Sequence, residues 1–160
     1  MEHEQDTRKG LASALQAEYY LDMRILVTGD RHWNCTDLAE RVVNLLLARY
    51  GPDMVIIHSG ACGVDEAFAK ACRKLGVVAE PHLADWKGLG NVAGPARNRT
   101  MVRAGIDLCI AVHRDLAASK GTKDCVRQAL AAGIAVYLIE DDQAVPKRVQ
   151  AGDKRLDVSK

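Results

Sequence analysis

The stretch MVIIHSGACGVDEAFAKAC, residues 54–72, contains the change of pattern that decides the fold. It begins with a short apolar run, which is typical of a buried strand, and its second half is alanine-rich with the spacing of a helix. Gly60 and Gly63 lie between the two, so the stretch predicts a strand-to-helix turn built on glycine. In α/β proteins phosphates are often bound at such turns, where free N–H groups open a helix.

The same alternation of short β-branched runs and helical segments continues along the chain. Five strands and four helices are expected, the strands near residues 24–28, 54–58, 77–82, 107–112 and 135–139 and the helices at 36–50, 65–75, about 95–104 and 123–132. Strands that alternate with helices predict right-handed crossovers and a parallel sheet. We therefore expect an α/β fold of the Rossmann-like, doubly wound type, with a mainly parallel sheet of about five strands and helices on both faces.

The length of 160 residues fits one compact domain. The alternating unit spans residues 23–140. Residues 1–22 precede it as an N-terminal extension that could form a short helix. Residues 141–160 contain few apolar side chains and are expected to form a loose C-terminal tail.

The bulk composition argues against several classes of partner and site. Twenty-two basic and 21 acidic side chains leave a net charge of +1, so the strongly basic balance of a nucleic-acid binder is missing. No run approaches the ~20 apolar residues that cross a membrane, and the N-terminus lacks the pattern of a secretory signal. We expect a cytoplasmic protein with no membrane partner. The five cysteines are scattered without a CxxC pair, so neither a metal site nor a cofactor is expected.

Glycine-containing or polar segments follow four of the expected strands. The candidate ligand-binding residues are, in chain order, Gly29, Asp30 and Arg31, then Gly60, Gly63 and Asp65, then Arg97, Asn98 and Met101, and finally Ser119, Gly121 and Thr122. Because the carboxyl ends of parallel strands meet at one edge of the sheet, these segments are expected to form one shared ligand site.

Three of these segments allow alternatives. Arg97 and Asn98 could also belong to an exposed polar helix start. Arg31 could pair with a phosphate and Trp33 could stack on a base, or Asp30 and Arg31 could form a surface ion pair while Trp33 covers the core. Asp65 in the first turn of a helix would repel a phosphate at contact distance. It is therefore either a helix cap or an acceptor for a sugar hydroxyl.

Known phosphate-binding motifs are incomplete here. The turn at 28–33 is not the GxGxxG of dinucleotide enzymes, and the turn at 119–124 lacks the full GxxxxGK[ST] of P-loop NTPases. Conventional hydride transfer and P-loop chemistry are both disfavoured.

In their order along the chain, four segments resemble the YspA-type branch of the SLOG superfamily: MRILVTGDR at 23–31, HSGACGVD at 58–65, GPARNRTM at 94–101 and SKGT at 119–122. The resemblance covers residues 23–139. The superfamily includes the Lonely Guy phosphoribohydrolases, which release a cytokinin base from a nucleoside monophosphate, and the DNA-processing protein A family. It implies a nucleotide or nucleotide-derived ligand, such as a nucleoside monophosphate, ADP-ribose or an NAD-like molecule.

The resemblance also implies roles for single residues. Phosphate would be held by Gly60, Gly63, Gly121 and Thr122, and the base and ribose side would be lined by Arg97, Asn98 and Met101. The phosphoribohydrolases carry a PGGxGTxxE-like loop with a catalytic glutamate, whereas residues 118–125 read ASKGTKDC. Asp124 stands near the glutamate position with one methylene less reach. If the ligand is cleaved, Arg97 and Asp124 are the catalytic candidates.

Three functions remain open. The leading expectation is a sensor or ligand-binding module for a small nucleotide-type molecule. The first alternative is an enzyme, an N-glycosidase of the phosphoribohydrolase type. The second is a DNA-processing accessory protein, which is disfavoured by the neutral charge and by the scarcity of interleaved aromatic residues. The resemblance also implies a homo-oligomer.

Overall fold

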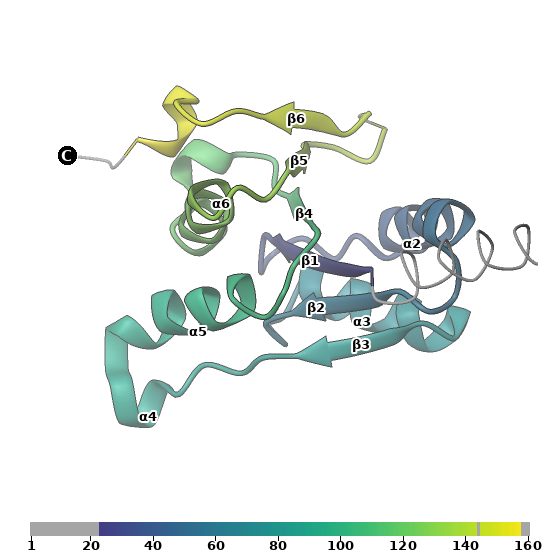
Figure 1. Cartoon of the computed structure of the whole chain (residues 1–160), viewed down its shortest axis with the longest axis horizontal. Coiled ribbons are helices and arrows are strands. Elements are labelled where there is room, and N and C mark those ends of the chain that lie inside the picture. Colours follow the sequence, from purple (N-terminus) through teal and green to yellow (C-terminus); the bar gives the residue numbers. More distant parts are fainter. Residues whose placement is uncertain (1–22, 144, 158–160) are drawn as a thin grey trace, which may run out of the picture.

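The computed structural model describes residues 23–143 and 145–157, and there it confirms the α/β architecture (Figure 1). One six-stranded sheet has the order β3-β2-β1-β4-β5-β6. The strands are β1 (Arg24–Gly29), β2 (Val55–His58), β3 (Val78–Pro81), β4 (Leu108–Val112), β5 (Val136–Ile139) and β6 (Lys147–Val149). The short helix expected within residues 1–22 lies outside the described residues.

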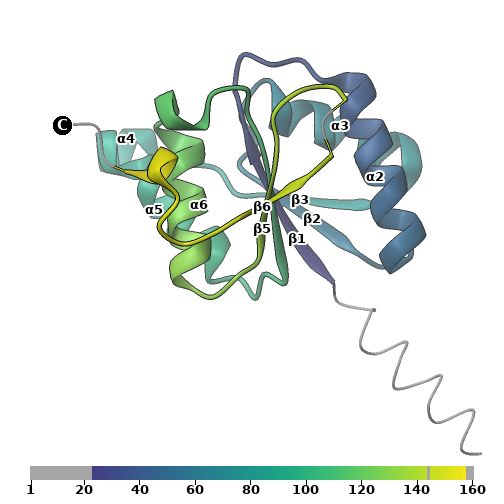
Figure 2. The ribbon, with the colours of Figure 1, turned by 90° about the horizontal axis from the view of Figure 1, so that it is seen from above.

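Two long helices cover each face of the sheet, as Figure 2 shows with the sheet seen edge-on. Helices α2 (Thr36–Tyr50) and α3 (Val64–Leu75) lie on one side, and α5 (Ala93–Val102) and α6 (Gly121–Ala131) lie on the other. Alternate residues of β1 point to opposite faces, so Ile25 and Val27 pack with α2 and α3 while Leu26 packs with α5 and α6. Burial on both faces explains why the strands read as continuous apolar runs.

The winding direction switches between β1 and β4, which are parallel neighbours at the centre of the sheet. The Asp30 N–H donates to the Val112 carbonyl oxygen at 3.0 Å, which holds the ends of these two strands together. The loops that follow β1, β2, β3 and β4 therefore open at the same edge of the sheet. Ligands of doubly wound folds bind at this edge.

The connection between β3 and α5 differs from the expected irregular loop at 84–94. It contains the short helix α4 (Trp86–Leu89) and a 3₁₀ turn at Gly90–Val92, and α5 begins at Ala93, two residues before Pro95. A local cap explains α4, because the Asp85 carboxylate accepts a hydrogen bond from the Gly88 N–H at 2.9 Å. Asp85 therefore acts as a helix N-cap.

The expectation of a loose tail at 141–160 is wrong for the residues that the structure describes. β6 pairs antiparallel with β5 and becomes the sixth strand of the sheet. Val149 and Leu156 are buried in the core beneath α6, and the Lys123 ammonium donates to the Asp157 carbonyl oxygen at 3.2 Å. Two well-placed apolar side chains are enough to dock this segment, although its overall apolar content is low.

The helices in residues 23–143 and 145–157 include none that is both long and apolar enough to cross a membrane.

Candidate functional site

Gly63 and Gly29 bring the starts of two loops into contact. A Cβ on Gly63 would lie 2.5 Å from the Arg31 carbonyl oxygen, and one on Gly29 would lie 2.5 Å from the Val112 carbonyl oxygen. The Val64 N–H donates to the Asp30 carbonyl oxygen at 3.0 Å. The first amide of α3 is thus used to dock α3 on the β1–α2 loop, and both glycines have a packing role.

The segment after β1 shows which of its two alternatives the chain adopts at Trp33. Trp33 is only 5% exposed and covers the core, with the Arg114 guanidinium 4.3 Å from its ring centre. The Asp30 carboxylate accepts from the His32 N–H at 2.8 Å. Arg31 is exposed, and within the described residues no ion pair joins it to Asp30.

Asp65 fastens the β2–α3 loop to α3. Its carboxylate accepts hydrogen bonds from the Ser59 N–H at 2.8 Å and from the Ser59 hydroxyl. The N-cap position of α3 is Gly63, so Asp65 does not cap its own helix. Gly60 has a left-handed backbone with φ of 73°, and its N–H donates to Nδ1 of His58 at 3.0 Å.

Asp65 and Arg97 influence each other's ionisation from two different helices. Burial raises the pKa of Asp65 to about 6, while the hydrogen bonds from Ser59 and the charge of Arg97 act in the opposite direction. Burial lowers the pKa of Arg97, and the nearby Asp65 and Asp124 charges partly offset this. A partly buried cation thus stands close to the start of α3.

Asn98 links Arg97 to α6. The Arg97 Nε–H donates to Oδ1 of Asn98 at 3.0 Å, and the Asn98 amide donates to Oδ2 of Asp124 at 2.9 Å and to the Gly121 carbonyl oxygen at 3.3 Å. Gln128 donates to the same Asp124 oxygen at 2.8 Å. These contacts fix the order of the side chains across the α5–α6 interface.

The helix-start cluster comprises the residues that these contacts and charges bring together, namely Ser59, Asp65, Arg97, Asn98, Gly121 and Asp124.

At the start of α6 the backbone is exposed at Gly121. The Ser119 hydroxyl accepts from the Thr122 N–H at 3.1 Å and from the Lys123 N–H at 3.3 Å, and both Ser119 and Thr122 are buried. Gly121 is exposed, and its N–H forms no hydrogen bond with any residue that the structure describes. Gly121 is therefore the first-turn amide of α6 that an anion could reach.

Met101 lies elsewhere than the resemblance implies. It is 1% exposed and packs in the core with Leu26 and Val126. Its side chain helps to hold α5 against the sheet.

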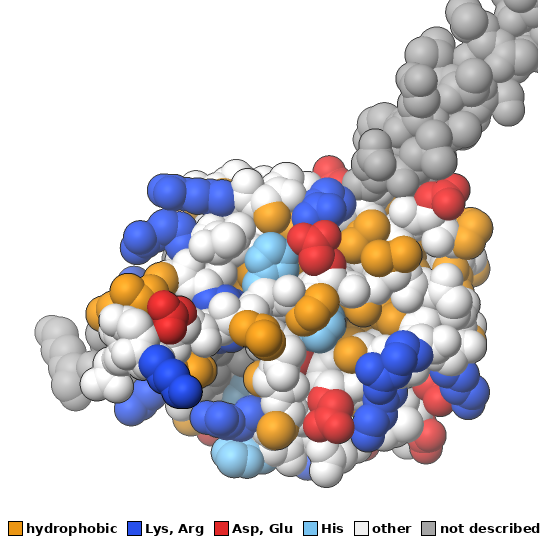
Figure 3. Space-filling model, turned by 90° about the horizontal axis from the view of Figure 1, so that it is seen from below, with side chains coloured by type: hydrophobic (Ala, Val, Ile, Leu, Met, Phe, Trp, Pro, Cys, Tyr) orange, Lys and Arg blue, Asp and Glu red, His pale blue; other side chains and the backbone are white. Residues whose placement is uncertain are grey.

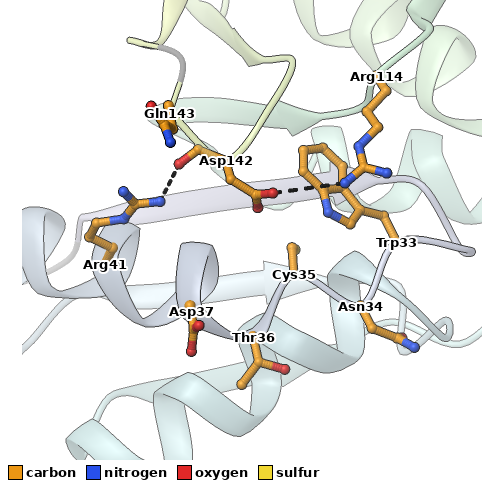
Figure 4. A pocket seen from close by; sticks show the side chains of 9 residues that line it. All are labelled: Trp33, Asn34, Cys35, Thr36, Asp37, Arg41, Arg114, Asp142 and Gln143. Atoms are coloured by element: carbon orange, nitrogen blue, oxygen red, sulfur yellow. Dashed lines mark hydrogen bonds and ion pairs between the residues drawn. The ribbon is translucent and has the colours of Figure 1, made fainter.

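A cavity of about 760 Å³ opens beside the ends of β1, β4 and β5, over the start of α2 (Figure 4). Arg41 and Arg114 approach Asp142 from opposite sides: Arg41 donates to the Asp142 backbone carbonyl oxygen, and Nη2 of Arg114 lies 3.9 Å from the carboxylate. Burial raises the pKa of Cys35 in its wall to about 11, so this thiol is a poor nucleophile.

Sequence reasoning missed this cavity because its walls come from three elements that share no motif. Its volume suits a small ligand. Its two guanidinium groups are already engaged by Asp142, however. Of the residues that the sequence offered for ligand contact, it is lined by Trp33 alone. The helix-start cluster is the better candidate, since its cation, Arg97, forms no ion pair with any residue that the structure describes.

Comparisons with known proteins support the resemblance to the SLOG superfamily. Residues 23–88 match the YAcAr family, described as the YspA, cpYpsA-related SLOG family. The Gene 61 protein of Mycobacterium phage D29 is 40% identical over 123 residues, which cover 74% of this chain and 97% of that protein.

Among solved structures, the DNA processing protein A (DprA) of Streptococcus pneumoniae is similar, with a TM-score of 0.57 and 18% identity. The match covers 74% of this chain and 51% of the DprA chain, so this chain spans about half of DprA. At this identity the likeness concerns the fold. The family match and the identity to the phage protein over nearly its whole length, together with the shared fold, establish that this chain belongs to the YspA- and cpYpsA-related SLOG family.

Proposed function

We propose that the protein binds a nucleotide or nucleotide-derived ligand at the helix-start cluster and acts as a ligand-binding or sensor module. The observation that carries the proposal is the state of Arg97. Its guanidinium is half-buried, which lowers its pKa, and yet no carboxylate lies within ion-pair distance of it in the described part of the chain. A partly buried cation without an ion-pair partner is costly, and an anionic ligand would offset that cost.

The two nearby carboxylates are engaged by other groups. Asp65 accepts from Ser59, and Asp124 accepts from Asn98 and Gln128. Among the residues that the structure describes, the Arg97 guanidinium donates one hydrogen bond, from its Nε–H to Asn98. The Nη groups of Arg97 are therefore available to a phosphate, which arginine binds with charge-assisted hydrogen bonds.

The exposed start of α6 adds a second anion-binding group. The free Gly121 N–H lies at the positive end of an 11-residue helix. Asn98 contacts the Gly121 carbonyl oxygen and neighbours Arg97, so both anion-binding groups belong to one small region. A phosphate held by Arg97 and the α6 start would leave the rest of a nucleotide to extend along the sheet edge.

The contacts of Asp124 favour binding over cleavage. Both amide hydrogen bonds to Asp124 are accepted by the same oxygen, Oδ2, and they hold this carboxylate at the α5–α6 interface. A carboxylate that assists cleavage must instead reach the departing base or the attacking water. The N-glycosidase therefore stays the alternative.

The test is a thermal-shift and calorimetric titration of the full chain with AMP, ADP-ribose and NAD. A ligand present at 100 times its Kd should stabilise the fold by about 2.7 kcal/mol. Arg97→Gln should abolish the stabilisation, whereas Arg99→Gln, on the exposed side of the same helix, should keep it. The proposal is wrong if none of the three ligands shifts the wild-type melting temperature.

The same samples distinguish the alternatives. Release of free base that Asp124→Asn abolishes would make the protein an N-glycosidase. Retention on single-stranded DNA that falls steeply with salt would favour the DNA-processing alternative.

A further inference from the structure

The connection between β3 and α5 exposes a group of large apolar side chains. The apolar strip comprises Leu83 (77% exposed), Trp86 (60%), Leu89 (49%) and Val92 (60%). Figure 3 shows the face on the β3 side of the molecule, where exposed hydrophobic side chains lie among charged ones. Scattered exposed apolar residues are ordinary, but four within ten residues are a candidate binding surface.

Trp86 is the one exposed aromatic side chain among residues 23–143 and 145–157, since Trp33 and Phe68 are buried and Tyr50 and Tyr137 are partly covered. Its backbone is held in place. The Asp85 carboxylate caps α4 at the Gly88 N–H, and the Leu89 N–H donates to the Asp85 carbonyl oxygen at 2.9 Å. An aromatic ring on an anchored turn loses little conformational entropy when a ligand packs on it.

Two side chains of the apolar strip, Trp86 and Leu83, pack on glycines that lie close in sequence to residues of the helix-start cluster. A Cβ on Gly94 would lie 3.3 Å from Cη2 of Trp86, so the indole ring rests on the first turn of α5, one turn before Arg97. A Cβ on Gly60 would lie 2.7 Å from Cδ2 of Leu83, which therefore covers the residue after Ser59. Both contacts are made by the ends of side chains that pack directly on glycine backbone.

We propose that Trp86, supported by Leu83, stacks on the base of the ligand whose phosphate is held by Arg97 and the start of α6. This inference rests on the proposed function and adds the recognition of the base. Gly94, beneath the indole, is four residues from Asn98, about 6 Å along the helix axis, and Asn98 contacts the Gly121 carbonyl oxygen. The ring and the anion-binding groups are thus separated on the scale of one nucleotide.

Stacking predicts a broad base preference. Every base has a π face, so Trp86 would accept purines and pyrimidines and hold the larger purines more tightly. Discrimination between adenine and guanine would require polar groups at the base edge, which the apolar strip does not supply.

The experiment compares AMP with ribose 5-phosphate, which has the same phosphate and sugar but no base, by calorimetry on the full chain. Trp86→Ala should weaken AMP binding about tenfold or more and leave ribose 5-phosphate binding unchanged. Trp86→Phe should retain most of the AMP affinity. Leu45→Ala, at an exposed leucine on α2 across the sheet, is the control and should alter neither ligand.

Tryptophan fluorescence gives an independent readout that needs no destabilising substitution. AMP should quench the emission that is lost in Trp86→Phe, and ribose 5-phosphate should not. The inference is overturned if Trp86→Ala leaves AMP affinity intact or weakens both ligands equally, or if AMP binds without quenching. If AMP, ADP-ribose and NAD all fail to bind the wild-type protein, the proposed function is wrong and the inference falls with it.

Discussion

At the scale of single residues, Gly63 is the position where the fold depends most directly on the lack of a side chain. Its backbone has a φ of 73°, and any Cβ would collide with the backbone of Arg31. Gly133 has a similar φ of 77°, but nothing lies within 4 Å of its Cβ position. A comparison of substitutions at Gly63 and Gly133 therefore separates the cost of backbone strain from the cost of steric collision.

Gly63→Ala should destabilise the protein by roughly 3 kcal/mol or more, because it combines left-handed strain with displacement of the β1–α2 loop. Gly133→Ala carries only the strain and should cost about 1–2 kcal/mol. Urea unfolding of both variants measures the difference. Equal losses of unfolding free energy in the two variants would show that the β1–α2 loop can move away from a side chain at position 63 at little cost.

The glycine spacing predicted the turn at Gly63 but not this packing role. Spacing along the chain reports which backbone conformations are needed locally. The collision partner, Arg31, lies 32 positions earlier and meets Gly63 only once β1 and β2 are paired. The hydrogen bonds from Ser59 to Asp65 could not be predicted either, because they depend on how the β2–α3 loop folds back on α3.

At the scale of elements, the segment from β6 to Leu156 is an integral part of the sheet and of the core beneath α6. Leu156 is 7% exposed and belongs to the same buried cluster as Val149 and Val126. The buried Lys123 ammonium donates to the carbonyl oxygens of Ala117 and Asp157, which ties the start of α6 to this segment.

Leu156→Ala should therefore cost about 2–4 kcal/mol of unfolding free energy, from lost burial and the cavity that remains. Val145→Ala, at a side chain that is 76% exposed, should stay within about 0.5 kcal/mol of wild type. Denaturant unfolding of the full chain checks both values. A near-neutral Leu156→Ala would mean that the segment docks without contributing to the core.

β6 was not predicted from the sequence because its apolar pattern is too short to indicate a strand. The strand has three residues, Lys147–Val149, and only one of them is buried. The long helices were predicted well because many apolar positions recur at helical spacing, whereas α4 depends on the single cap at Asp85.

At the scale of the whole molecule, Asp65 makes stability depend on pH in an unusual direction. Its carboxyl group ionises near pH 3.8 in an unfolded chain, but burial raises its pKa to about 6 in the fold. Between these values the unfolded state binds fewer protons, so the contribution of Asp65 to stability falls as pH rises. Above about pH 6 the loss is complete.

Asp65→Asn should remove this decrease of stability with rising pH. The stability difference, wild type minus variant, should decrease by on the order of 3 kcal/mol between pH 4 and pH 7. Asp153→Asn is the control, because Arg155 lowers the pKa of Asp153 to about 2 and its contribution changes only below about pH 4. Urea unfolding at several pH values measures both, and a flat profile for Asp65→Asn would contradict the effect of burial.

The winding of the sheet could be predicted from alternation alone, and with it the convergence of four strand ends. The placement of Arg97 near Asp65 and Asp124 follows from that topology. The cavity between Arg41 and Arg114 could not be predicted, because no local pattern records which loops become neighbours in space.

Both outer strands of the sheet are poor templates for a further strand. β3 has four residues and ends at Pro81, which lacks an N–H, and its Glu80 is held by Arg24 at 3.2 Å. β6 has three residues and presents the exposed cations Lys147 and Arg148. Short, charged or proline-containing edges discourage edge-to-edge association, so we expect neither edge of this sheet to recruit a strand from a second molecule.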